Sequence, residues 1–251
     1  MITVGPFLKW EGGKIDMARR ILEKFPLETI DTLRIPFLGG GSVLLAFLQS
    51  EAKYQKVIAS DLNTDLIDVW KAVQADPEKL FKQIQQMAVS QRAYYDIRKS
   101  YNKSRNPAMF MYLNRCCLKG LYRVSKDGDF NVTWGGRQKY ELFSLKQLKR
   151  VSELIKDVKF IDCDFATALK DVKKEDFVYL DPPSNTLIGN NTLNGLPDAR
   201  WTELFNTLET LLAKFILTGP NRCFMWDNFK SLKKFIISRI WAVDEILISS
   251  S

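Results

Sequence analysis

An aspartate followed by two prolines is the part of this sequence best suited to chemistry. The apolar run 177–180 (Phe-Val-Tyr-Leu) leads directly into Asp181, Pro182, Pro183 and Ser184. A proline removes a backbone donor and stiffens the chain, so a strand is expected to end here. Asp181 is then held rigidly at the carboxyl end of a strand, where open α/β sheets bind their ligands. It is the leading candidate for a catalytic carboxylate.

A glycine turn and a second acid indicate a nucleoside ligand. The segment 37–42 (Phe-Leu-Gly-Gly-Gly-Ser) lies between a predicted strand and a predicted helix, and glycines there let the backbone approach a ligand closely. Asp61 follows Gly41 by 20 residues and ends the next predicted strand. At this spacing a carboxylate accepts hydrogen bonds from the two hydroxyls of a ribose. The segment carries neither a dinucleotide fingerprint nor a P-loop.

A third acidic segment, 162–165 (Asp-Cys-Asp-Phe), ends the following predicted strand. Asp164 could accept a hydrogen bond from an adenine amino group while Phe165 contacts the ring. A helix N-cap before Ala166 is an equally good interpretation of Asp164.

The composition excludes several classes of protein. The 251 residues include no histidine, which excludes Ser-His and Cys-His catalysis and most zinc sites, so we expect no metal. The N-terminus lacks the features of a signal peptide, and no apolar stretch approaches the roughly 20 residues that span a bilayer. The four cysteines show no metal spacing and suit reduced thiols in a cytoplasmic protein. They are Cys116, Cys117, Cys163 and Cys223.

The apolar patterns alternate between strands and helices at both ends of the chain. Strands are predicted at 32–37, 57–61, 158–162, 177–180, 215–218 and 243–249, with helices at 15–25, from 42, and from 62 to 70. Strand-helix-strand order implies a parallel sheet with crossover connections. The rhythm stops between about 71 and 155, where Asp76-Pro77 opens a helical stretch. We therefore predict one domain from 1–70 and 156–251, and a second at 71–155.

The middle of the chain is strongly basic. From Lys71 to Lys159 there are 19 lysines and arginines against 8 acidic residues, a net charge of +11, whereas the whole chain carries +8. A basic region inserted into a slightly acidic frame favours contact with a polyanion. A solvated, charged helical region without function is the alternative.

Taken together, these segments resemble the Dam-type DNA adenine-N6 methyltransferases of the D12 class, in that family's order. The motifs that carry the resemblance are 6–14, 36–42, Asn114-Arg115, 120–123, 128–132, Asp164-Phe165, Asp181-Pro182-Pro183 and 244–248. The resemblance implies an α/β, Rossmann-like sheet that binds S-adenosylmethionine, with an inserted helical and β-hairpin target-recognition domain. It also implies methylation of duplex DNA, for example in restriction-modification, by a chain that we expect to be monomeric.

The resemblance further assigns roles to individual residues. Asp181 and the Pro182 carbonyl would accept both protons of the target adenine amine and aim its lone pair at the methyl group. The target base must first leave the duplex, at a cost of a few kcal/mol. The cofactor contacts implied by the family are Trp10, Lys14, Phe37, Gly39, Gly40, Asp61, Asp164 and Phe165.

A hairpin in the basic region is the predicted DNA reader. Asp127-Gly128 is a strong signal for a two-residue turn, and a two-stranded ribbon fits the major groove. The family places Arg123 against a guanine, Leu121 against a thymine methyl and Lys9 near another guanine, which favours a GATC-like site. Arg115 matches an arginine that contacts phosphate or the flanks. The full set of predicted DNA-binding residues is Lys9, Arg115, Lys119, Leu121, Arg123 and Asn131.

Two catalytic positions depart from the family's pattern. Ser184 stands where an aromatic residue stacks on the flipped base, which forfeits roughly 1–3 kcal/mol. Ile35 stands where an acid often helps to hold the cofactor. Two hypotheses follow: a DNA methyltransferase weakened by Ser184, or a catalytically impaired homologue that acts as a DNA-binding protein.

Overall fold

The computed structural model describes residues 3–26, 28–136, 142–183, 196–220, 233–240 and 243–249. The chain forms two compact units. The sheet unit comprises Lys14–Leu38, Ser50–Leu62 and Asp157–Ser251. The helical unit comprises Met1–Gly13, Gly39–Gln49 and Asn63–Lys156.

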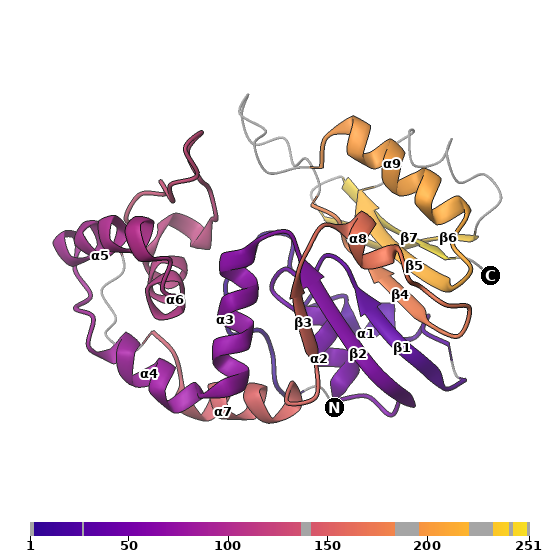
Figure 1. The fold of residues 1–251 in the computed structure, drawn as a ribbon, viewed down its shortest axis with the longest axis horizontal. Coiled ribbons are helices and arrows are strands. Elements are labelled where there is room, and N and C mark those ends of the chain that lie inside the picture. The colour runs from indigo at the N-terminus through magenta and orange to yellow at the C-terminus, as the bar shows by residue number, and fades with distance from the viewer. Residues whose placement is uncertain are drawn as a thin grey trace. The chain divides into compact units, whose positions relative to one another are not determined.

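The sheet unit is built on seven strands in the order β3-β2-β1-β4-β5-β7-β6 (Figure 1). The strands are β1 (Ile30–Ile35), β2 (Tyr54–Asp61), β3 (Lys159–Asp162), β4 (Phe177–Leu180), β5 (Lys214–Pro220), β6 (Lys233–Ile240) and β7 (Val243–Ser249). The first five pair in parallel, β7 runs antiparallel to β5, and β6 runs antiparallel to β7. This topology confirms the predicted α/β class with a Rossmann-like parallel sheet.

The sequence of strand β4 is continuously apolar because both faces of the strand are buried. Successive side chains of a strand point to opposite faces, and all four residues of β4 are buried. Val178 and Leu180 pack with α8 (Phe165–Leu169) and α9 (Asp198–Glu209), which lie close together in Figure 1. Tyr179 lies against Phe25, which follows α1 (Ala18–Leu22). The strand that carries Asp181 at its end is therefore fixed from both faces.

The helical unit contains six α-helices and one 3-10 turn among its described residues. They are α2 (Ser42–Leu48), α3 (Thr64–Ala75), α4 (Pro77–Gln85), α5 (Gln91–Ser104), α6 (Pro107–Cys116), η1 (Leu118–Gly120) and α7 (Leu145–Leu154). Asp76 caps α4 by accepting a hydrogen bond from the backbone of Lys79 at 2.9 Å, which confirms the predicted helix start. The unit contains all of 71–155 together with α2 and α3; the domain boundaries at 70 and 156 stay a prediction.

Two elements differ from the sequence-based expectation. The helix predicted at 15–25 is confined to Ala18–Leu22, because Lys14 turns inward to an ion pair and Ile15 stays 59% exposed. Strand β6 was not predicted, since its apolar residues at 235–237 and 240 do not alternate; it pairs with β7 as an antiparallel hairpin.

Candidate functional site

Asp181 follows the last residue of β4, and two donors hold one of its two carboxylate oxygens. The ammonium of Lys14 lies 3.1 Å from Oδ1, and the hydroxyl of Thr218 donates to the same oxygen at 2.9 Å. Among the described residues, none donates a hydrogen bond to Oδ2. The carboxylate is thus oriented by one oxygen and open at the other, the arrangement required of a group that must accept a hydrogen bond from a substrate.

Thr218, on β5, was not among the predicted site residues. Its side chain is completely buried, and its hydroxyl lies 2.9 Å from Asp181 Oδ1 and 3.1 Å from the Tyr179 hydroxyl. A hydroxyl has one proton to donate. The nearest acceptor for that proton is Asp181, and the Thr218 oxygen also lies within hydrogen-bond distance of the Tyr179 hydroxyl. A polar residue that closes the apolar run 215–217 was the sequence signal for this role.

Two opposing effects, burial and a nearby positive charge, act on the pKa of Asp181. Burial raises the pKa of the Asp181 carboxyl, whereas Lys14 and the Thr218 hydroxyl lower it. The Lys14 side chain is only 7% exposed, so the ion pair is poorly screened by solvent. Loss of Lys14 would leave a carboxylate that is only 21% exposed without its countercharge. The structure therefore gives Lys14 a contact with Asp181 that its predicted role at the cofactor did not include.

The prolines after Asp181 fix the chain as it leaves the sheet. Pro182 is buried, and the Pro183 carbonyl accepts a hydrogen bond from the backbone of Leu196 at 3.1 Å. Ser184 lies outside the described residues.

Four predicted cofactor residues besides Lys14 lie in the sheet unit. The rings of Phe37 and Phe165 pack with their centres 5.5 Å apart, and Asp61 ends β2 beside β3. Asp164 accepts a hydrogen bond from the backbone of Ala166 at 2.8 Å, which confirms the N-cap interpretation. Its other carboxylate oxygen pairs with Arg200, whose guanidinium stands 4.5 Å above the Phe165 ring. A contact between Asp164 and adenine stays a prediction that must compete with Arg200.

The remaining predicted cofactor residues meet in the helical unit. A Cβ atom on Gly39 would lie 3.1 Å from the Trp10 ring, and one on Gly40 would lie 2.8 Å from Trp10 Cβ. Trp10 also stacks on Tyr122, with ring centres 5.8 Å apart. The glycine turn is therefore required by the packing of tryptophan, and its role at the cofactor stays a prediction.

The predicted hairpin is present, with one difference at its tip. Ser125 donates to the Asp129 carbonyl at 2.7 Å, and Gly128 adopts a φ of +82°. Three residues, 126–128, thus form the loop in place of the predicted two, because Gly128 supplies the left-handed third position. Behind the tip, the Arg123 guanidinium donates to the Asn131 side-chain oxygen at 2.7 Å. Two predicted DNA-reading residues are brought together.

Asn114 joins other parts of the predicted DNA-binding set. It is 4% exposed and pairs with both backbone groups of Lys9, at 2.9 and 2.6 Å. A Cβ atom on Gly120 would lie 2.5 Å from Lys9 Cβ, so Lys9 passes directly over the turn before Leu121. Lys119 is exposed with a φ of +56°. Asn114 belongs to one of the family motifs in the sequence, but the sequence does not indicate that its side chain binds the backbone of Lys9.

The side chain of Arg115 contacts other residues of the helical unit. Its guanidinium donates to the Phe7 carbonyl at 2.6 Å and lies 4.8 Å above the Phe143 ring. Its predicted contact with DNA phosphate remains a prediction.

Within the described part of the chain, no group of three or more cysteines and acidic residues could hold a metal ion. None of the described helices is long and apolar enough to cross a membrane.

A parallel sheet in the order 3-2-1-4-5, extended by the antiparallel pair 7-6 and carrying Asp-Pro-Pro after β4, defines the methyltransferase class of Rossmann-like folds. Comparison with known proteins gives the family. The profile described as D12 class N6 adenine-specific DNA methyltransferase matches residues 10–223, and the chain belongs to this family.

Relatives in this family share moderate identity with the chain. It is 38% identical over 206 residues to the Type II methyltransferase M.MjaIII of Methanocaldococcus jannaschii, covering 74% of this chain and 71% of that protein. It is 31% identical to M1.LlaDCHI of Lactococcus lactis subsp. cremoris, covering 72% and 66%. It is 30% identical to the DNA adenine methylase of Haemophilus influenzae, covering 71% and 63%. The chain thus spans slightly less than two thirds of the last two relatives.

Proposed function

We propose that this protein transfers a methyl group from S-adenosylmethionine to the N6 atom of adenine in duplex DNA. The observation that carries the proposal is the half-engaged carboxylate of Asp181, with Oδ1 held by Lys14 and Thr218 and Oδ2 open to a donor. The adenine amine is a donor of the required kind. Family membership supports DNA as the substrate.

The chain's own residues would prepare the amine for reaction. Asp181 Oδ2 and the Pro182 carbonyl accept hydrogen bonds from its two N–H groups, which localises the nitrogen lone pair and aims it at the methyl group. The nitrogen gains positive charge as its bond to the methyl group forms and the bond between methyl and sulfur breaks, and the Asp181 carboxylate stabilises that charge in a site of low polarity. Asp181 is then placed to take the proton that the methylated nitrogen loses. No covalent enzyme intermediate is required, so a chain without histidine can perform the reaction.

The sheet unit contains groups that fit the proposed cofactor. Asp61 presents a carboxylate at the end of β2 for the ribose hydroxyls, and the half-buried ring of Phe37, backed by the buried ring of Phe165, offers an apolar wall to the adenine base. Bound S-adenosylmethionine would supply an electrophilic methyl group. Lys14, by contrast, acts on the carboxylate of Asp181 in this proposal.

The hairpin is the proposed reader of the DNA sequence. Arg123 is exposed and is already oriented by Asn131, so its guanidinium is partly ordered before it meets a guanine. We propose a GATC-like recognition site for this hairpin, with Lys9 and Leu121 as further base contacts.

A radioactive methyl-transfer assay on unmethylated duplex DNA tests the function. Asp181→Ala is expected to lower the rate about a hundredfold or more, the loss typical of removing a group that stabilises developing charge. Asp162→Ala is the matched control, because Asp162 is an exposed acid at the end of a parallel strand in the same sheet. Equal rates for the two variants would overturn the assignment of Asp181.

Ser184→Tyr separates the two hypotheses left by the sequence. Restored stacking on the flipped base is expected to raise transfer roughly tenfold to a hundredfold. If neither the native chain nor Ser184→Tyr transfers methyl groups while DNA still binds, the protein is a DNA-binding homologue without catalytic activity.

A further inference from the structure

One edge of the hairpin is held by side chains of α5. Asn102 pairs with both backbone groups of Phe130: its side-chain oxygen accepts the Phe130 N–H at 2.9 Å, and its amide donates to the Phe130 carbonyl at 3.1 Å. The ring of Phe130 is 3% exposed and packs against Tyr101 and Tyr122. This residue is therefore fixed by both its backbone and its side chain.

The same face of α5 holds the neighbouring carbonyls on that edge. Arg105 donates to the Gly128 carbonyl at 2.8 Å, and Arg98 donates to the Val132 carbonyl at 2.9 Å. Tyr94, one turn earlier, donates to the Val132 carbonyl as well, at 2.8 Å. Carbonyls 128, 130 and 132 are thus all satisfied by one helix.

The spacing of helix and strand explains this match. Three to four residues of helix advance by about 4.5–6 Å, and two residues of strand advance by about 6.6 Å. Asn102 and Arg98 of α5 therefore keep pace with the carbonyls of 130 and 132, while Arg105, which caps the C-terminal end of the helix, reaches the Gly128 carbonyl in the hairpin loop.

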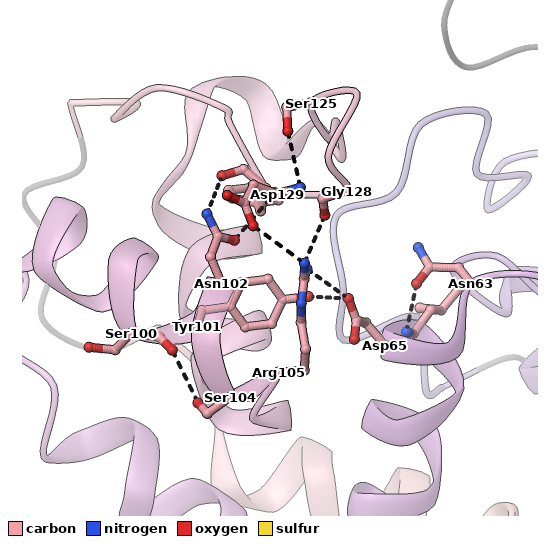
Figure 2. A network of polar contacts seen from close by, with 12 residues as sticks. Asn63, Asp65, Ser100, Tyr101, Asn102, Ser104, Arg105, Ser125, Gly128 and Asp129 are labelled. Carbon is pink, nitrogen blue, oxygen red and sulfur yellow. Dashed lines mark hydrogen bonds and ion pairs between the residues drawn. The ribbon is translucent and has the colours of Figure 1, made fainter.

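The helix is itself anchored, as Figure 2 shows. The Tyr101 hydroxyl donates to Asp65 at 2.6 Å, and the Arg105 guanidinium lies 3.4 Å from the same carboxylate oxygen and 3.7 Å from Asp129. Asp65 stands in the first turn of α3. The hairpin tip, α5 and the start of α3 are joined in one polar network.

The contacts with α5 on the inner edge of the hairpin also fix its outer face, which carries Arg123 and Asn131. Phe130 directs its N–H and carbonyl to α5, whereas the next residue, Asn131, donates its N–H to the Arg123 carbonyl at 3.0 Å. Side chains alternate in the same way, so Asn131 points away from the buried ring of Phe130. On that outer face its side-chain oxygen accepts a hydrogen bond from Arg123. A two-stranded hairpin is marginally stable on its own, so its outer face depends on what holds its inner edge.

We propose that α5 is the positioning element of the DNA-reading hairpin, and that Asn102 is a positioning residue for base recognition through Arg123 and Asn131. The proposal rests on the proposed function, in which this hairpin reads the DNA. Asn102 touches no base; it sets the register of the strand that carries Asn131.

Hydrogen exchange of the free protein and methyl transfer to duplex DNA together test the proposal. In Asn102→Ala, backbone amides of 128–132 should exchange about tenfold faster, because a lost buried hydrogen bond is worth about one factor of ten. In a randomised duplex pool, preference for the best site over its single-base variants should fall about tenfold. The KM for DNA should rise, and the KM for S-adenosylmethionine should stay unchanged.

Two further variants keep the test decisive. Ser100→Ala is the matched control, because among the described residues the Ser100 hydroxyl bonds only to the Asp96 carbonyl within α5, at 3.1 Å. Arg105→Asn covers the case in which Asn102→Ala does not fold. Asparagine tolerates the left-handed φ of +51° at this position, and it is too short to hold the Gly128 carbonyl as arginine does.

The outcomes separate this proposal from the proposed function. Exchange and site preference that match Ser100→Ala in both Asn102→Ala and Arg105→Asn would overturn the positioning role. A native chain that methylates no duplex would overturn the proposed function and the base-reading part of this proposal. The exchange data would still decide whether α5 holds the hairpin.

Discussion

The ammonium of Lys14 is placed to control the charge of the carboxylate that would accept the substrate's amine protons. Asp181 accepts hydrogen bonds at both carboxylate oxygens only when it is ionised, and burial already raises its pKa against the opposing effect of Lys14. Lys14→Gln removes the positive charge, so the pKa of Asp181 should rise further. As the pH falls, activity should therefore be lost at a higher pH than in the native chain. The acidic limb of the kcat/KM profile measures this shift.

Lys14→Arg is the control for this prediction. It keeps the charge beside Asp181, so its acidic limb should lie closer to that of the native chain than the limb of Lys14→Gln does. An acidic limb in Lys14→Gln that is unmoved or shifted to lower pH would contradict a role for the ion pair.

The variant Arg115→Ala tests whether a residue predicted to contact DNA instead stabilises the folded protein. Its guanidinium donates to the Phe7 carbonyl and covers the Phe143 ring, so Arg115→Ala should lower the free energy of unfolding by about 1–3 kcal/mol. Urea denaturation measures this change. A variant with native stability and uniformly weaker DNA binding would instead support the phosphate contact that the sequence suggested.

At the scale of elements, the last glycine of the turn between β1 and α2 is the most tightly constrained of the three. Gly41 has a φ of +69°, and a Cβ atom there would lie 2.4 Å from the ring of Trp70. Gly41→Ala should therefore destabilise the protein by about 2–4 kcal/mol, from overpacking and a strained backbone together.

Gly12→Ala is the matched comparison for Gly41→Ala. Gly12 also has a positive φ, of +75°, but a Cβ atom on it would meet nothing within 4 Å. It should cost only about 1–2 kcal/mol, the backbone part alone. Equal losses of stability, measured by thermal or urea unfolding, would show that the Trp70 contact relaxes without cost.

At the scale of the whole molecule, the concentration of charge predicts salt-sensitive binding to duplex DNA. A protein that neutralises several phosphates releases counterions, so affinity should fall at least tenfold between about 50 and about 200 mM salt. Lys126→Ala, in the exposed hairpin loop, should reduce the slope by about one, whereas Lys53→Ala, in the sheet unit, should leave it unchanged. Fluorescence anisotropy on a labelled duplex makes the comparison, and a slope that is flat for the native chain would exclude the basic region as the DNA-binding surface.

Local signals were enough to predict the parallel sheet and several site residues. Apolar runs bounded by acids and prolines located β1 to β5, and Asp76-Pro77 located the start of α4. These features are short-range, since each depends on residues within one element and its cap. Asp181, Asp61 and Phe165 were chosen in the same way, because each stands at or near the end of such an element, whereas Phe37 came from the family resemblance; their roles stay predictions.

What the sequence determined by itself was the fold class, the family and the residue types at the strand ends. Only the tertiary structure decided which side chains meet: Lys14 and Thr218 on one oxygen of Asp181, and Asn102 on both backbone groups of Phe130. The physical reason is sequence separation. Lys14 and Asp181 lie 167 positions apart in the chain. No local sequence pattern indicates a contact between two residues that meet only when the sheet has folded.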